Sequence, residues 1–199
     1  MLRQFFKSAH HPAAGPPLIR VSEGLGLYQP HVSLAPELYA LVGAQRAYLH
    51  TYLPWVDTVH SLEDAQKLLR SAVSYNRKNH RLMLYILERG ELLGAVGLVN
   101  IYRADRKAEI GYWLRHDRQG EGIITHCAEK LMHHAYVLLQ YHRLFIQVAA
   151  DNAASRAVAE RLGFQLEGKL REASYLHGAF HHVCLYGHLR ADWAARHGR

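Results

Sequence analysis

The middle of this chain alternates between strand and helix patterns in an order that restricts the folds open to it. Residues 107–114, "KAEIGYWL", alternate as a strand does, and residues 123–140 carry apolar side chains at helical spacing. Residues 143–150, "RLFIQVAA", alternate again. Strand, helix and strand in succession predict a crossover, in which a helix covers one face of a sheet that is at least partly parallel.

The segments on either side extend this prediction to a mixed α/β domain. We expect a strand or short hairpin at 18–30, helices beginning at the N-caps Ser33 and Ser61, and two strands joined by a turn at Arg89 and Gly90. A short helix at 151–163 and strands at 164–172 and 181–193 follow, which gives a second crossover. The order predicts helices on both faces of a mixed, mostly antiparallel sheet.

Length and composition favour one globular domain. The 199 residues have 49% hydrophobic and 21% charged side chains, and no run approaches the ~20 apolar residues that span a bilayer. We expect residues 1–17, which contain three prolines, to form a flexible leader and residues 18–199 to form the domain. Cys127 and Cys184 show no paired motif, so we expect free, buried thiols in a cytoplasmic protein.

The net charge of +7 and the pI of about 9.5 favour anionic partners, such as nucleic acid, an acidic surface or a phosphorylated cofactor. The charge is dispersed, so we expect no direct sequence-specific binding of nucleic acid and no membrane binding. Although there are 16 histidines, several of them lie in adjacent pairs, which point in different directions on a helix or strand. We therefore expect no bound metal.

A loop with two glycines connects the strand at 107–114 to the helix that follows. It reads "RHDRQGEGIITHC", and it lacks both the Walker A pattern and the third glycine of a dinucleotide fingerprint, where Thr125 stands. The backbone N–H groups of such a turn and the helix dipole nevertheless favour an anion, with Arg115 and Arg118 as compensating charges. The alternative is a plain turn that begins a surface helix.

A carboxylate stands in the strand just before this loop. Glu109 shares one face of the strand with Gly111 and Trp113, and a charged group is seldom buried without a partner. It is therefore a candidate functional residue. The alternative is a structural ion pair with Arg103, Arg106 or Lys107.

Three motifs together resemble a known family. "KAEIGYWL", "QGEGIIT" and "NAASRAVAERLGF", in this order and spacing, are similar to the GCN5-related N-acetyltransferase superfamily. "LPW" at 53–55 and the C-terminal "EGKLREASYLHGAFHHVCLYGHLRADW" resemble its subgroup of ribosomal-protein N-terminal serine/alanine acetyltransferases. The similarity covers roughly residues 18–195, and the ordered set is far more specific than any one motif.

The resemblance implies a fold with splayed central strands and acetyl-coenzyme A as the acetyl donor. The pyrophosphate would lie on the glycine loop and the pantetheine arm between the splayed strands. The cofactor-binding residues would be Leu114, Arg118, Gln119, Gly120, Glu121, Gly122, Ile123, Asn152 and Ser155. Asp117 stands where the family usually has Gln or Arg, but this contact is mostly through the backbone, so we expect binding to survive. From the residues alone, Asn152 and Ser155 are equally explained as helix caps.

The implied reaction moves an acetyl group from a thioester to an amine that must arrive neutral. By resemblance to a related branch we expect Glu109 to be the base. Glu172 is the alternative, because some relatives carry Glu where this chain has Ser174. Ser155 would donate a proton to the departing sulfur.

The acceptor is the least constrained part of the prediction. Tyr28, Trp55 and Tyr175 are candidates for the acceptor pocket, although core packing explains them equally well. We expect acetylation of the N-terminal α-amino group of a protein, by resemblance a ribosomal protein. The alternatives are a small amine, such as a polyamine or an antibiotic, and a basic RNA-binding or ribosome-binding module without catalysis. A homodimer is also open.

Overall fold

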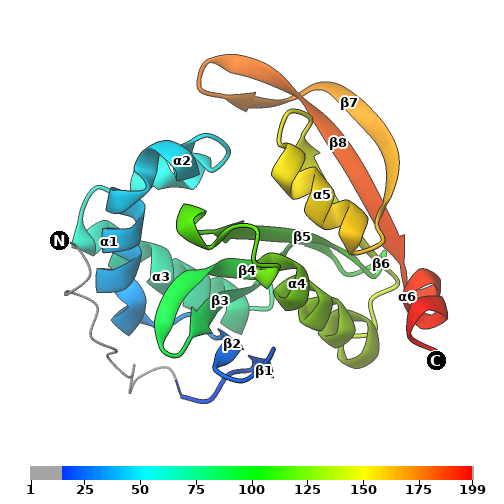
Figure 1. Ribbon diagram of the computed structural model, residues 1–199, viewed down its shortest axis with the longest axis horizontal. Coiled ribbons are helices and arrows are strands. Elements are labelled where there is room, and N and C mark those ends of the chain that lie inside the picture. The colour runs from blue at the N-terminus through cyan, green and yellow to red at the C-terminus, as the bar shows by residue number, and fades with distance from the viewer. Residues whose placement is uncertain (1–14, 199) are drawn as a thin grey trace.

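The structure, a computed structural model, describes residues 15–198 and contains one eight-stranded sheet in the order β1-β2-β3-β4-β5-β6-β8-β7 (Figure 1). The strands are β1 (Ile19–Arg20), β2 (Leu25–Tyr28), β3 (Leu82–Glu88), β4 (Glu91–Tyr102), β5 (Lys107–Leu114), β6 (Arg143–Ala149), β7 (Gln165–Leu176) and β8 (Ala179–Leu189). The α-helices are α1 (Ala35–Ala44), α2 (Arg46–His50), α3 (Leu62–Arg77), α4 (Ile123–His133), α5 (Ala153–Arg161) and α6 (Arg190–His197). Short helical turns are η1 (Val32–Leu34), η2 (Pro54–Thr58), η3 (His116–Arg118) and the π-helical η4 (His134–Leu138).

The sheet is antiparallel except where β5 meets β6. These two strands pair in parallel only from Lys107 to Glu109, opposite Arg143 to Phe145. Farther along they separate, because β5 keeps its partner β4 while β6 keeps its partner β8. The predicted fold class is therefore confirmed: a mixed, mostly antiparallel sheet with splayed central strands and helices on both faces.

Two apolar clusters hold these layers together. One contains the buried faces of α4 and α5 and Trp193 of α6, packed on inward-facing residues of β2 to β6 and β8. The other packs α1 and α3 on the opposite face, against side chains of β3 and β4 such as Tyr85 and Leu92. The period-2 pattern of the strands explains both clusters, since alternate residues point to opposite faces. Cys127 and Cys184 are free and buried, as expected.

Local sequence signals set most boundaries. Ser61 and Asp64 form a reciprocal capping box at the start of α3, as the sequence predicts. The tight turn between β3 and β4 falls at Arg89 and Gly90, both with positive φ (49° and 86°). This conformation suits a two-residue hairpin.

Three predicted boundaries, two of helices and one of a strand, were wrong. Ser33 does not cap α1: its backbone N–H is itself bonded to the His31 ring within η1, and α1 begins at Ala35 with a proline in its first turn. The helix expected at 123–140 is α-helical only to His133 and then widens into η4. The last strand ends at Leu189, because the Asp192 carboxylate caps the backbone N–H of Leu189 and starts α6.

The proposed leader falls largely outside the described residues, so the domain boundary at residue 18 stays a prediction. Between residues 15 and 198, no helix has both the length and the apolar character needed to cross a membrane.

Candidate active site

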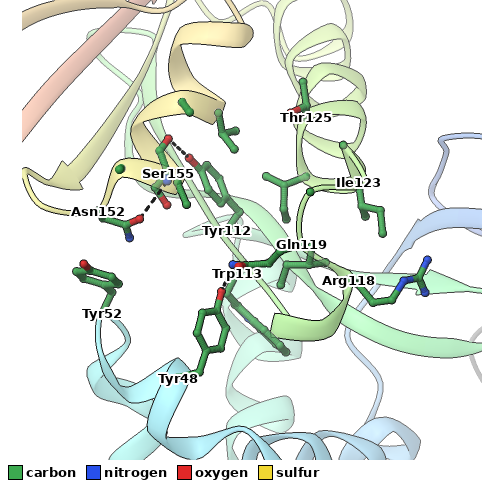
Figure 2. A pocket seen from close by; sticks show the side chains of 18 of the residues that line it. Tyr48, Tyr52, Tyr112, Trp113, Arg118, Gln119, Ile123, Thr125, Asn152 and Ser155 are labelled. Atoms are coloured by element: carbon green, nitrogen blue, oxygen red, sulfur yellow. Dashed lines mark hydrogen bonds between the residues drawn. The ribbon is translucent and has the colours of Figure 1, made fainter.

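The separation of β5 from β6 opens a space that Tyr112 partly fills (Figure 2). The Tyr112 hydroxyl donates a hydrogen bond of 3.1 Å to the backbone carbonyl of Ser155 in α5. Burial raises the pKa of Tyr112 to about 12, so this hydroxyl stays protonated at neutral pH. This hydrogen bond therefore links β5 to α5 on the side where the strands separate.

A cavity of about 760 Å³ lies beside this gap, a volume typical of sites for small molecules. It is lined by the end of β5, the glycine loop, the first turn of α4, α5 with the residues before it, and the segment around α2. Of the residues predicted to bind the cofactor, all but Glu121 line it: Leu114, Arg118, Gln119, Gly120, Gly122, Ile123, Asn152 and Ser155.

The glycine loop meets this cavity through its backbone. Gly120 and Gly122 have φ of 79° and 76°, a left-handed conformation that costs other residues about 1–2 kcal/mol. Gly122 is the N-cap of α4 and offers no side chain to the free N–H groups of the first turn. Thr125 in that turn lines the cavity, and its Oγ1 is buried without a hydrogen-bond partner. A phosphate oxygen would satisfy the hydroxyl and the N–H groups together.

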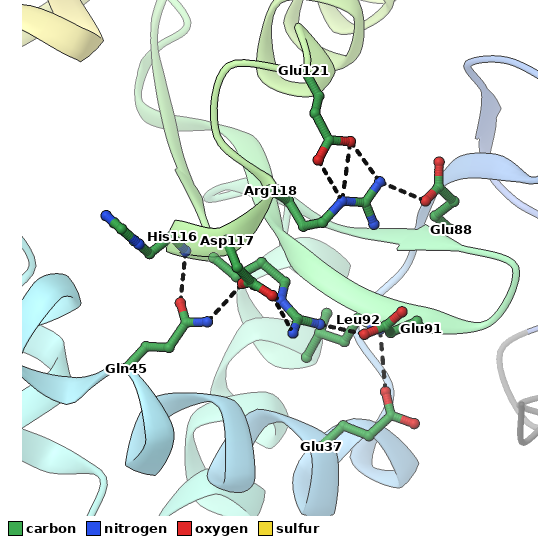
Figure 3. A network of polar contacts seen from close by, with 10 residues as sticks. Glu37, Gln45, Glu88, Glu91, Leu92, His116, Asp117, Arg118 and Glu121 are labelled. Carbon is green, nitrogen blue, oxygen red and sulfur yellow. Dashed lines mark hydrogen bonds and ion pairs between the residues drawn. The ribbon is translucent and has the colours of Figure 1, made fainter. Parts of the chain in front are cut away.

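The arginines beside the loop are already neutralised (Figure 3). Arg118 donates to the carboxylates of Glu121 and Glu88, each at 2.8 Å. Arg115 pairs with Glu91 and with Asp117, whose pKa falls to about 2 through its hydrogen bond to Arg115. The expectation that these arginines compensate a bound anion is therefore unsupported.

Asp117 does not disturb the anion site. Its carboxylate faces Arg115 and the side-chain amide of Gln45, which also accepts from the backbone N–H of His116. Asp117 is absent from the cavity lining. The departure from the family pattern at this position thus leaves the backbone of the loop intact.

Asn152 and Ser155 lie where the first turn of α5 meets the cavity. The Asn152 Oδ1 accepts the backbone N–H of Ser155 at 3.0 Å and caps α5, and both residues line the cavity. Capping fixes where the Ser155 side chain lies.

Glu109 is half-buried on β5 and does not line the cavity. Its Oε2 accepts a hydrogen bond of 2.7 Å from the Asn100 side chain, and burial raises its pKa. The alternative explanation, a structural ion pair, is wrong, since Lys107 pairs with Asp105, and Arg103 and Arg106 donate to backbone carbonyls. A raised pKa is typical of a general base, and from its place outside the lining Glu109 would reach a molecule in the cavity only through an intervening water.

Glu172 lies elsewhere, on an irregular stretch of β7 between Leu170 and Ser174. It is exposed and has a φ of 52°, its N–H donates to the His182 ring at 3.0 Å, and it does not line the cavity.

None of the three aromatic candidates for the acceptor pocket lines the cavity. Tyr28 and Trp55 are partly buried against the cluster formed by α1 and α3, and the Trp55 ring lies 5.5 Å from that of Trp113. Tyr175 is 62% exposed and packs on Phe180 at the end of the β7–β8 hairpin.

The sequence reasoning missed the side of the cavity formed by α2. Tyr48 bonds to the Gln119 side chain, and Tyr52 faces Asn152 across the opening (Figure 2). Asp151 and Arg161, at the two ends of α5, complete the polar lining. The "YLHTY" spacing placed both tyrosines within one helical turn, but nothing in the sequence pairs that turn with a loop about 70 residues away.

The tip of the β7–β8 hairpin touches α2 above this opening. The His177 Nε2 lies 2.7 Å from the His50 carbonyl, and the two imidazole rings are 3.7 Å apart. With Asp57 they form the one group of potential metal ligands among residues 15–198, and it lies outside the cavity lining. The cavity lining itself contains no such group.

The fold, the splay and the glycine loop are those of an N-acetyltransferase. Residues 25–165 match the family model described as Acetyltransferase (GNAT) domain, so the chain belongs to this family. It is an acetyl-CoA-dependent N-acetyltransferase, and the unpartnered Thr125 and the free amides fit that donor.

Individual relatives refine the match. The chain is 34% identical over 171 residues to the ribosomal-protein-serine acetyltransferase of Escherichia coli K12, spanning 86% of this chain and 96% of that protein. The RimL ribosomal L7/L12 α-N-protein acetyltransferase in complex with coenzyme A superposes with a TM-score of 0.82 at 33% identity, covering 86% and 97% of the two chains. The microcin C7 self-immunity acetyltransferase MccE, bound to acetyl-CoA and AMP, gives a TM-score of 0.83 at 30% identity and covers 88% and 98%.

Proposed function

We propose that this protein acetylates the N-terminal α-amino group of a ribosomal protein. The observation that carries the proposal is the extent of similarity to the E. coli ribosomal-protein-serine acetyltransferase, which spans 96% of that enzyme. The spermidine N1-acetyltransferase of the same organism is 28% identical over 102 residues, only 55% of its length. This acceptor class would place the reaction in the cytoplasm.

In the proposed complex, the free amides from Gly120 to Thr125 and the Thr125 hydroxyl hold the pyrophosphate of acetyl-CoA. The pantetheine arm enters where β5 separates from β6 and bonds to main-chain groups near Leu114. Asn152 and Ser155 meet the arm near its thioester end. Each of these residues lines the same cavity.

The chemistry needs one proton to leave the amine and one to reach the sulfur. The neutral amine attacks the thioester carbonyl, a C–N bond forms and the C–S bond breaks. Glu109 accepts the amine proton through a water molecule, since it lies off the cavity, and Ser155 donates to the thiolate. Such a base contributes about 10²–10⁴-fold to the rate. Glu172, exposed and off the cavity, is the weaker alternative.

The electrostatics favour an α-amino group over a polyamine. An α-amino group has a pKa of about 7.7–8.0, against about 10.4 for lysine, so far more of it is neutral at pH 7. The net charge of +7 also repels a polycation.

A second candidate is a small antibiotic-like amine. The similarity to MccE, whose structure contains AMP beside acetyl-CoA, favours this alternative. It predicts an acceptor that carries a nucleotide rather than a peptide chain.

The test compares acceptors by release of free thiol from acetyl-CoA. We expect kcat/KM to be highest for peptides that begin with Ser or Ala, and to vanish when the same peptides are blocked at the N-terminus but retain a lysine. Spermidine and an aminoacyl sulfamoyl adenosine are the competing acceptors. If either exceeds every peptide, the ribosomal-protein proposal fails. Mass spectrometry of ribosomal proteins treated with the enzyme then identifies the acceptor.

Two variants check that the activity belongs to the proposed site. Glu109→Gln should lower kcat at least tenfold with little change in acetyl-CoA affinity. Glu63→Gln, an exposed glutamate on α3, is the matched control and should leave kcat unchanged. An unchanged rate for Glu109→Gln would remove it from the mechanism and promote Glu172.

A further inference from the structure

A second cavity, of about 530 Å³, lies at the other end of β5 from the glycine loop. It forms where three connections meet: the one from α3 to β3, the one from β4 to β5, and the one from η4 to β6. It shares no lining residue with the donor cavity. No step of acetyl transfer uses it.

Three arginines line this second cavity, and no carboxylate does. They are Arg81, Arg103 and Arg106. The nearby carboxylate of Asp105 is paired with Lys107 at 2.7 Å and does not neutralise them. A guanidinium stays charged at any physiological pH, so the cavity carries a concentrated positive charge.

The guanidinium groups are held in place but keep N–H donors to spare. Arg103 donates to the Asn79 carbonyl at 2.6 Å, and Arg106 to the Gln140 carbonyl at 2.6 and 3.1 Å. Arg81 lies over the Tyr75 ring, 5.1 Å from its centre. Each contact uses only some of the N–H donors of the planar guanidinium group, and the remaining donors suit phosphate oxygens.

The rest of the lining is apolar or weakly polar. Leu98 is fully buried, Leu82 and Ile101 are half-buried, and Tyr141 contributes an aromatic ring. The arginines are exposed at the rim, so the cavity is an open pocket with an apolar floor. A pocket of this kind suits a small molecule rather than a long polyanion.

The backbone around the cavity is strained. Asn79, Arg106 and Gln140 have φ of 55°, 50° and 58°, and they are three of the seven non-glycine residues with positive φ between residues 15 and 198. The π-helical turn η4 lies directly beside them. Such conformations cost free energy and often mark sites of function.

We propose that this arginine-lined cavity binds a small ligand that carries a phosphate group and an apolar or aromatic portion. The ligand occupies a site separate from that of acetyl-CoA. The site accounts for clustered positive charge that acetyl transfer does not need.

Isothermal titration calorimetry tests the proposal with coenzyme A held at saturation, so that the donor cavity is already filled. The probes are inorganic phosphate and AMP. We expect one site per chain for each probe, with AMP binding more tightly than phosphate alone because of its ring. Arg81→Gln and Arg103→Gln should each weaken binding about tenfold, the loss of one charge-assisted contact.

Arg77→Gln is the matched control, since it removes one positive charge from an exposed position on α3 that does not line the cavity. It should bind both probes as the unsubstituted protein does. Arg81→Gln is the primary variant because its side chain bonds no backbone carbonyl in the structure, and thermal unfolding of each variant confirms that it is folded.

The proposal is overturned if neither probe binds at saturating coenzyme A, or if Arg77→Gln weakens binding as much as Arg81→Gln. It is also overturned if a single-stranded RNA binds and the control weakens that binding equally, since the charge would then act as a diffuse surface. AMP binding that neither Arg81→Gln nor Arg103→Gln weakens would belong to the acceptor side and would also overturn the proposal, because neither arginine lines the donor cavity. Since acetyl transfer is not measured, a failure here leaves the proposed acceptor untouched.

Discussion

Replacing Asn100 with glycine should raise the pKa of Glu109 and move the acidic limb of the rate profile to higher pH. The Asn100 amide donates to the Glu109 carboxylate at 2.7 Å and so favours its charged form. Burial acts in the opposite direction and is the larger effect. Glycine is the substitution of choice, because Asn100 has a φ of 31° and a larger side chain would add strain.

The size of the shift follows from the hydrogen bond that is lost. A hydrogen bond to a charged group contributes about 1.5–3 kcal/mol, and one pKa unit corresponds to about 1.36 kcal/mol. Because Asn100 is exposed, water replaces part of the interaction, and we take the lower end of this range, about 1.5 kcal/mol in favour of the charged form. A base works only when ionised, so raising its pKa lowers the rate at pH values below the new pKa and leaves the plateau at higher pH unchanged.

The assay is the pH dependence of kcat with one acceptor peptide, together with carboxyl 13C NMR of Glu109. The α-amino group of the peptide titrates alike in every variant, so the difference between variants isolates Glu109. Asn79→Gly is the control, because Asn79 is also an asparagine with positive φ (55°), and its backbone carbonyl accepts a hydrogen bond from Arg103. An NMR shift without any movement of the rate profile would refute Glu109 as the base.

Three further predictions concern the donor site and the core. Thr125→Val removes a buried hydroxyl that has no partner, so it should leave the free protein as stable or stabilise it by about 1 kcal/mol, yet weaken acetyl-CoA binding measured by calorimetry. Tighter donor binding in this variant would exclude the hydroxyl as a phosphate ligand. Ser155→Ala should lower kcat while the dissociation constant of acetyl-CoA stays within about threefold, and rapid-quench kinetics would show the loss in the chemical step. Tyr112→Phe is the control: it keeps the ring but loses the hydrogen bond to the Ser155 carbonyl, and so separates this effect from the packing of α5. Leu131→Ala, at a fully buried position on α4, should destabilise the protein by about 2–5 kcal/mol in urea unfolding; a loss below about 1 kcal/mol would contradict the assignment of α4 to the core.

The fold was predictable where local patterns and packing agree. The strands β3 and β4 are continuous apolar runs joined by a turn, and β5 alternates. The residues of the α3 capping box lie within four consecutive positions. The N-cap predicted at Ser33 was wrong because the His31 ring, two positions earlier, accepts the Ser33 N–H instead. The predicted end of the last strand was wrong because the Asp192 carboxylate accepts the Leu189 N–H and begins a helix there.

The side of the cavity formed by the glycine loop was predictable for a related reason. Its loop and its helix start are contiguous in sequence, so their geometry follows from glycine conformation and helix termini alone. The opposite side of the cavity includes Tyr48, Tyr52 and Asp151, which no short-range pattern connects. The aromatic candidates were chosen for residue type, and packing rather than type decides which aromatic side chain reaches a cavity.

The neutralised arginines of the glycine loop bear on how the protein responds to ionic strength. Arg115 and Arg118 are occupied by Asp117 and by three glutamates, so the loop presents amide dipoles rather than net charge to the donor. Salt screens full charges far more than it screens short hydrogen bonds in a partly enclosed site. Raising the salt concentration should therefore weaken the binding of anions in the arginine-lined cavity more steeply than the binding of acetyl-CoA at the glycine loop.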